Sequence, residues 1–404
     1  MATVAPVHQQ AGETPTHDEL VARARAMIPT LKERAKQCVA DRNVPAETIA
    51  EMQAAGFFRI LQPKRFGGYE MHPNTFFAVQ KLIAEGCMST GWMYGVVGCH
   101  PYELALFDDK AQQEVWADAS DMLVSSTYQP VGKVEPTEGG FYLSGHWGFS
   151  TGSVHCGWVL LGALVPPSEE GGPPDMRTFL LPREDYEILT DEWHVFGLQG
   201  TGSHGIKVDR AFVPEYRTHR AVEGFLCQNP GQKVNTGPLY SLPWAQVFIR
   251  SVSTAAFGGA RAAINAAMAI MQSRISTNTG KASKDDPMLA AAISKAHAQT
   301  LEMELTLEKT FEDLMGIAER GEEIPFEKRA LYAYQSSTVV RRLAALVDDM
   351  VELLGGRAIY MTSEIIQPWL DIKAARAHVA NDPNNRTADV IGTQLGQPPV
   401  FNFM

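Results

Sequence analysis

The chain has 404 residues, a length that favours two or three packed modules over a single core. Hydrophobic residues make up 45% of it and charged residues 20%, proportions that are ordinary for a globular enzyme. The formal net charge is −11 and there is no long basic run, which argues against nucleic acid as the main partner because phosphate binding needs a positive surface.

The first 120 residues predict a short lead-in followed by an N-terminal helical domain. Residues 1–16 are polar and contain proline, without the charged and then apolar layout of a signal peptide, so we expect a disordered lead-in. From residue 17 to residue 120 apolar side chains recur at helical spacing. The expected helices span residues 18–41, 45–55, 74–85 and 91–107, and the last is apolar enough to be buried.

Residues 121–220 change to the pattern of β-strands and predict a β-barrel domain. Short runs of β-branched and aromatic residues occur at 123–127, 141–145, 158–162 and 178–181. Glycine-rich turns at residues 138–140 and 170–174 divide these runs. Short strands at regular intervals are typical of a barrel or a sandwich, and we expect a barrel.

Residues 221–404 return to long helices and predict a C-terminal bundle with a terminal tail. Long helices return from about residue 244: residues 252–274 are rich in alanine, and residues 287–316 and 325–354 are each long enough for a helix of about eight turns. The pair Gly355-Gly356 interrupts the pattern, which resumes over residues 363–378. Long helices with short connections indicate an antiparallel four-helix bundle. The fold expected for the whole chain is therefore mainly α with a central β-barrel module.

Common cofactor and metal motifs do not occur in the sequence. It contains no Walker A loop, no GxGxxG after a strand, and no HExxH, GxSxG or EF-hand pattern, so no metal is expected. The five cysteines are scattered without a CxxC pair, which favours neither a disulfide framework nor a zinc site and suits a reducing cytoplasm. No stretch approaches the roughly 18 apolar residues of a membrane span.

Several segments resemble acyl-CoA dehydrogenases and their relatives. Residues 61–68 followed by Ser89-Thr90-Gly91-Trp92 are similar to their N-terminal domain. Residues 145–152 resemble their flavin-facing β segment, and residues 197–203 the strands that follow. The resemblance covers nearly the whole chain and implies an N-terminal helical domain, a β domain and a C-terminal four-helix bundle.

Within that superfamily, the likeness is strongest to the oxygenase components of two-component flavin-dependent monooxygenases (group D). The segments Gly98-Cys99-His100, Pro243-Trp244 and residues 378–383 carry it by their order and spacing. The models are the hydroxylases of 4-hydroxyphenylacetate and of a 3-hydroxy-secosteroid. The resemblance implies ortho-hydroxylation of a phenolic substrate with O₂ and FMNH₂ or FADH₂, supplied by a separate NAD(P)H:flavin reductase. It also implies a homotetramer.

One departure from the acyl-CoA dehydrogenases bears on the reaction. Many of them carry a catalytic glutamate after the glycine pair, where this chain has Thr362, with Glu364 two residues later. A threonine hydroxyl is far too weakly basic to remove an α-proton, which disfavours dehydrogenation. The alternatives are a monooxygenase of the same fold acting on sulfur, nitrogen or an indole, a true acyl-CoA dehydrogenase, or a non-catalytic interaction protein.

Three residues are the candidate catalytic groups. The resemblance implies a flavin C4a-hydroperoxide, with the Thr151 hydroxyl against flavin N5 and Phe149 beside the ring; otherwise Thr151 is an ordinary strand residue. His100 is the candidate for sharing or removing the phenolic proton, although an isolated histidine in an apolar helix is often a core residue. His378 matches a position near the reacting edge of the flavin, or else interacts with a helix end.

The remaining candidates are residues that the resemblance places against the flavin. Each has a plainer interpretation: core aromatic for Trp92, strand-end turn chemistry for the hydroxyl residues of the first strand, and a solvated surface for the arginines. The resemblance suggests that the arginines act across a subunit boundary. The full set of expected cofactor-binding residues is Trp92, Ser126, Thr127, Tyr128, Phe149, Ser150, Thr151, Arg274, Gly356, Arg357, His378 and Val379.

Overall fold

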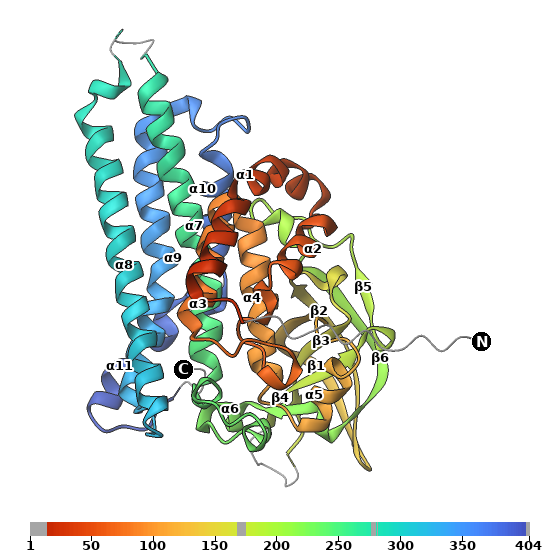
Figure 1. The fold of residues 1–404 in the computed structure, drawn as a ribbon. Helices are drawn as coiled ribbons and strands as arrows, with labels where there is room; N and C mark the ends of the chain where they lie inside the picture. The colour runs from red at the N-terminus through yellow and green to blue at the C-terminus, as the bar shows by residue number, and fades with distance from the viewer. Residues whose placement is uncertain (1–13, 168–174, 276–279, 281, 401–404) are drawn as a thin grey trace.

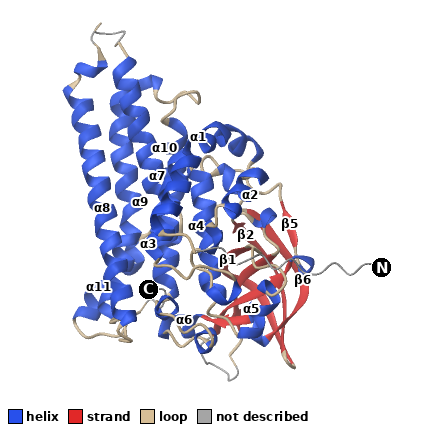
Figure 2. Ribbon diagram, in the orientation of Figure 1, coloured by secondary structure: helices blue, strands red, loops and turns tan. Residues whose placement is uncertain are grey.

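The computed structural model describes residues 14–167, 175–275, 280 and 282–400. Long helices form one side of the molecule, the sheet forms the other, and the N-terminal helices lie between them (Figures 1 and 2). Most of the predicted lead-in, the expected turn at 170–174 and the last four residues of the expected tail fall outside the described residues.

The N-terminal helices are α1 (His17–Asp41), α2 (Ala46–Ala54), α3 (Pro73–Gly86), α4 (Met88–Leu104) and α5 (Asp109–Trp116). Helix α1 starts at a capping box in which Thr16 and Glu19 satisfy each other's backbone N–H groups. All 17 residues of α4 are buried, because this helix packs against α3, α7 and the first strand. The predicted buried helix is therefore confirmed.

Within the described part of the chain, seven strands form the sheet, in the order β5-β6-β2-β1-β3-β4-β7. The pairing of β1 with β3 is parallel and all the other pairings are antiparallel. The strands are β1 (Val124–Thr137), β2 (Gly140–Ser150), β3 (Trp158–Val165), β4 (Asp175–Pro182), β5 (Glu187–Leu189), β6 (His204–Pro214) and β7 (Thr218–Arg220).

The predicted closed barrel is wrong, because this sheet is open. Its two edge strands, β5 and β7, are each three residues long and do not pair with each other within the described part of the chain. The register of β1 shifts between Thr127 and Gly132, so its first half pairs with β3 and its second half with β2. The two halves of the sheet enclose a core around Trp147 and Phe179 without closing.

The C-terminal helices are α6 (Ala221–Leu226), α7 (Trp244–Ser273), α8 (Pro287–Glu319), α9 (Phe326–Leu354), α10 (Ile366–Ala375) and α11 (Thr387–Gln394). Helices α7, α8 and α9 run side by side, and the shorter α10 packs on α7 and α9 (Figure 1). Helix α7 also packs on α3 and α4, which makes it the wall shared by the bundle and the N-terminal helices. The described helices include none with the length and apolar character needed to cross a membrane, and all five cysteines are free thiols.

Candidate active site

A continuous row of aromatic rings joins α4, β1, α7 and the segment after α10. Ring centroids lie 6.4 Å apart from His100 to Tyr128, 5.1 Å from Tyr128 to Phe248, 6.1 Å from Phe248 to His378 and 5.6 Å from His378 to Trp92. We call these five residues the aromatic row. It brings four of the predicted site residues together, from positions up to 286 apart in the sequence.

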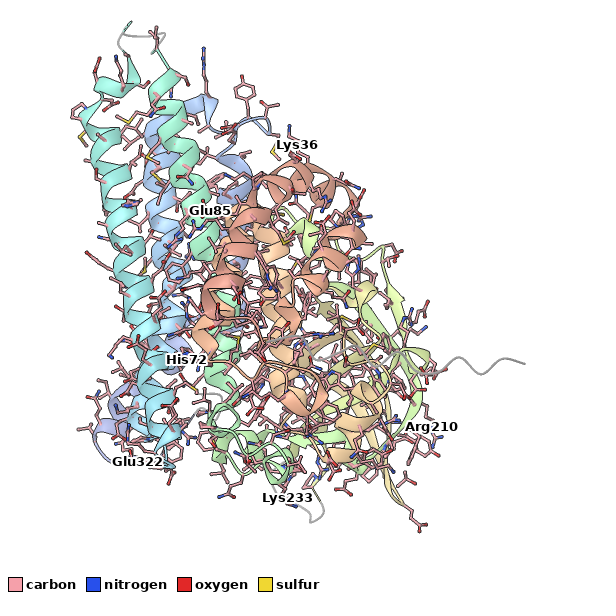
Figure 3. The ribbon with its side chains drawn as sticks, in the orientation of Figure 1. Lys36, His72, Glu85, Arg210, Lys233 and Glu322 are labelled. Carbon is pink, nitrogen blue, oxygen red and sulfur yellow. The ribbon has the colours of Figure 1, made fainter. Side chains whose placement is uncertain are left out.

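The row lies in the interior, and many charged side chains lie at the periphery, although some, such as Arg250 and Arg329, are buried. Lys36, Arg210, Lys233 and Glu322 all project at the periphery of the molecule in Figure 3. In the row, His100 is fully buried and Trp92 nearly so. The histidines of the row therefore lie beside aromatic residues of the hydrophobic core.

His100 is held as a neutral hydrogen-bond acceptor. Its Nδ1 lies 2.5 Å from the carbonyl oxygen of Val124. Because a carbonyl oxygen only accepts, Nδ1 carries the hydrogen and Nε2 is left as a bare acceptor. Nε2 is buried and has no hydrogen-bond partner among the described residues. Burial lowers the pKa of His100 to about 4, so the ring is uncharged at neutral pH.

His378 is held in the opposite tautomer. It precedes the short 3₁₀ turn Val379–Asn381, where its Nδ1 accepts the backbone N–H of Ala380 at 3.2 Å. An accepting Nδ1 leaves the hydrogen of the neutral ring on Nε2, which is therefore a donor. Burial lowers the pKa of His378 to about 4. Val379, also predicted for the site, is 67% exposed beside it.

Thr151 directly follows β2 and joins a chain of hydroxyl groups. Its Oγ1 lies 2.8 Å from Ser203 Oγ, which lies 2.7 Å from Thr201 Oγ1. All three side chains are buried. Ser150, the preceding residue, donates from Oγ to Ser125 Oγ at 3.2 Å. The end of β2 therefore presents hydroxyl groups whose directions are set by neighbouring strands and turns.

Phe149 takes an uncommon backbone conformation at the end of β2. Its φ is +67°, in the left-handed region that costs a non-glycine residue energy. The side chain is 60% exposed and meets Trp193 edge to face, with ring centroids 5.8 Å apart. A strained residue that presents an aromatic ring at the surface is typical of a contact surface for a ligand.

The β1 candidates line the strand where it meets α4. Ser126 and Thr127 are buried, and Tyr128 is partly buried. Side chains alternate along a strand, so Ser126 and Tyr128 share one face and Thr127 points to the other. The Tyr128 hydroxyl donates to the carboxyl group of Glu103, a residue not predicted for the site.

Arg274, Gly356 and Arg357 form a separate group at one end of the bundle. Arg274 directly follows α7, and its guanidinium donates to the carbonyl of Leu354, the last residue of α9. Gly356 and Arg357 follow in an exposed 3₁₀ turn. The helix between Phe248 and Arg274 spans roughly 39 Å at 1.5 Å per residue. Within one chain, the structure therefore does not bring these residues to the aromatic row.

Glu103 and Phe248 were not predicted for the site from the sequence, and Trp244 entered only as part of the family resemblance. Trp244 and Phe248 are four residues apart at the start of α7, so their rings share one helix face, 5.5 Å apart. That spacing was available as a signal. Glu103 had no such signal, because its partner Tyr128 lies on another element.

Comparisons with known proteins match nearly the whole chain. Residues 14–119 match the model of the acyl-CoA dehydrogenase N-terminal domain, and residues 251–383 that of an acyl-CoA dehydrogenase C-terminal domain. The flavin-dependent monooxygenase oxygenase subunit HsaA of Rhodococcus jostii (strain RHA1) is 35% identical over 381 residues, covering 93% of this chain and 98% of that protein.

Two further matches agree with that result. The oxygenase component of p-hydroxyphenylacetate 3-hydroxylase from Acinetobacter baumannii is 26% identical, covering 93% of this chain and 88% of that protein. The crystal structure of 3-HSA hydroxylase from Rhodococcus sp. RHA1 matches with a TM-score of 0.90 at 33% identity, covering 96% of this chain and 100% of that one. The resemblance read from the sequence is thus confirmed.

Proposed function

The chain belongs to the oxygenase subunits of flavin-dependent monooxygenases with an acyl-CoA dehydrogenase-type fold, and on that premise we propose that it hydroxylates a phenolic substrate, ortho to the hydroxyl, with reduced flavin and O₂. The observation that carries the phenolic substrate is His100, whose buried Nε2 is a bare acceptor beside the Tyr128 ring. A phenol offers the matching donor.

His100 acts on the substrate by sharing its phenolic proton. Because the His100 ring is neutral down to about pH 4, it accepts a hydrogen bond from the phenol and does not need to become a buried cation. Partial withdrawal of that proton raises electron density at the ortho carbon, where an electrophilic oxygen attacks. A sulfide or an amine supplies its own lone pair and makes no use of such an acceptor.

The residues present fit a reduced flavin, which when bound supplies the activated oxygen that is transferred. Thr151, in its hydroxyl chain, can both donate and accept at a ring nitrogen. The Phe149 and Trp92 rings offer faces for stacking, and Ser126, Thr127 and Ser150 offer further hydroxyl groups. His378 presents its Nε2–H as a donor, opposite in role to His100. No NAD(P)H motif is visible, which supports a separate reductase.

The arginine group supports assembly of several subunits around each flavin. Arg274 and Arg357 lie too far from the aromatic row to serve the flavin of their own chain, and cations suit its phosphate. Ile359, Tyr360 and Met361 beside them are each at least 63% exposed, an apolar surface next to the charged group. We therefore propose that a neighbouring copy contributes Arg274, Gly356 and Arg357, in a homotetramer located in the cytoplasm.

The test supplies the purified protein with FMNH₂ or FADH₂, isotopically labelled O₂ and a panel of phenols, sulfides, amines and indoles. The proposal expects labelled catechols from the phenols and identifies the preferred flavin in the same assay. Products from the sulfides, amines or indoles alone would overturn the phenolic assignment. Oxidation of acyl-CoA esters without O₂ would overturn oxygenation itself.

A further inference from the structure

Glu103 is a buried carboxyl group beside the aromatic row. It lies one helical turn after His100 on α4 and is 1% exposed. Its carboxyl oxygen accepts the hydroxyl of Tyr128, whose ring packs against His100, Trp244 and Phe248. Glu103 therefore fixes the hydroxyl group of Tyr128, whose ring contacts two other members of the row, His100 and Phe248.

The surroundings of Glu103 keep it uncharged. Burial raises its pKa to about 8, and the hydrogen bond from Tyr128 opposes part of that rise. The ionisable groups near it are Cys99 and His100 on α4 and Tyr128 on β1. Burial raises the pKa of Cys99 and Tyr128 and lowers that of His100, so all of them are neutral as well. From α7, Tyr128 meets the uncharged rings of Trp244 and Phe248.

We propose that Glu103 is a positioning residue for the hydroxylation: as a neutral acid it holds the Tyr128 ring against His100, and its ionisation disables the site. The inference rests on the proposed function, because it assigns a role beside the phenol acceptor. An ionised Glu103 is a buried charge without a cationic partner among the described residues, which favours rearrangement toward water. It also opposes the negative charge that builds up on the phenol oxygen.

The first test is the pH profile of kcat/KM for phenol hydroxylation, measured with chemically reduced flavin so that no reductase contributes. Wild-type activity is expected to fall about tenfold per pH unit above pH 8, as for a single ionisation. Free phenols ionise near pH 10, so the substrate itself does not cause this decline. Glu103→Gln keeps a hydrogen-bonding group but cannot ionise, and the decline is expected to disappear.

Two further variants separate positioning from general damage to the fold. Tyr128→Phe removes the hydrogen bond that lowers the pKa of Glu103, so the alkaline decline is expected to move to higher pH. Tyr94→Phe is the matched control. It removes another buried tyrosine hydroxyl, which lies on α4 and donates to the carbonyl oxygen of Phe57 at 3.1 Å. Its profile is expected to match the wild type. A decline that persists unchanged in Glu103→Gln overturns the inference.

A second readout does not depend on activity. The infrared carbonyl band of a protonated carboxylic acid is expected in the wild-type protein at neutral pH, to titrate away near pH 8, and to be absent from Glu103→Gln. A difference spectrum without such a band overturns the inference even if phenols are hydroxylated. If no phenol is hydroxylated but the band titrates as expected, the proposed substrate fails while the neutral state of Glu103 stands.

Discussion

His100 and His378 lie in one row of rings, separated by Tyr128 and Phe248, and are held in opposite tautomers. The Nδ1 of His100 donates to a backbone carbonyl, and the Nδ1 of His378 accepts a backbone N–H. In the neutral state the Nε2 of His100 is therefore an acceptor and the Nε2 of His378 is a donor. Two backbone contacts thus distinguish a hydrogen-bond acceptor from a donor, as the proposed roles of His100 toward the phenol and of His378 toward the flavin require.

Replacing His100 by Ala is expected to uncouple the reaction. Product formed per O₂ consumed should fall on the order of a hundredfold, the usual contribution of a group that manages a proton in the transition state. Flavin binding should persist. The matched control is His219→Asn, since His219 is equally buried, has a similarly lowered pKa and bonds Asn229 away from the row. An equal loss in both variants would mean that a buried histidine matters only for folding.

At His378, asparagine and alanine are expected to behave differently. Asparagine is a good capping residue and can accept the Ala380 N–H as His378 does, but it carries no group in the place of Nε2–H. His378→Asn should therefore keep the thermal stability of the wild type and lose hydroxylation. His378→Ala should lose both, with destabilisation of about 1 kcal/mol. If the asparagine variant kept its activity, the role of His378 would be limited to capping the turn that follows it.

Thr151 is expected to limit the release of hydrogen peroxide. Thr151→Val removes the hydroxyl while keeping a β-branched shape, and should raise the peroxide released per O₂ consumed. Thr151→Ser restores the hydroxyl at the same position and should return the yield toward the wild type. Thr201→Ser is the control, because it keeps the hydroxyl at the far end of the same chain. Equal peroxide from the valine and serine variants would argue against the hydroxyl.

Features set by residues close together in the sequence could be predicted, whereas features set by contacts between distant segments could not. The buried helix around His100 was predictable because its apolar residues are contiguous. The return of long helices at about residue 244 agrees with the start of α7 at Trp244, but only residues 252–274 were recognised as one helix, since buried polar residues such as Arg250 and Gln246 interrupt the apolar pattern before them. The open sheet and the pairing of Glu103 with Tyr128 depend on contacts between separate elements, which periodicity does not encode.

The pH dependence of folding stability should carry opposite contributions from two neighbours on α4. The unfolded chain protonates His100 near pH 6.5 and the folded one only near pH 4, so this residue makes stability fall as the pH drops through that window. Glu103 loses its proton near pH 4.5 when unfolded and near pH 8 when folded, so it makes stability fall as the pH rises. Denaturation midpoints of Glu103→Gln relative to the wild type should therefore improve from pH 5 to pH 8. A constant difference would contradict this.

A subunit-mixing experiment tests whether the arginines, which lie far from the aromatic row of their own chain, serve the flavin of a neighbouring copy. If each flavin uses His100 of one copy and Arg357 of its neighbour, then His100→Ala and Arg357→Ala should each be nearly inactive alone. In a hybrid that pairs one copy of each variant, one of the two active sites carries both substitutions and the other carries neither. About half of the wild-type activity should therefore return. The hybrid is isolated by co-expression with two affinity tags.

The control for mixing pairs two residues expected to serve the flavin from the same copy. A hybrid of His100→Ala with Thr151→Val should leave every site with one defect and restore nothing beyond the better parent. Restoration there would indicate that His100 and Thr151 serve one flavin from different copies. If the His100 and Arg357 hybrid also stays inactive while purified tetramers form, the arginines act outside the flavin site, and the exposed Ile359, Tyr360 and Met361 surface alone explains their position.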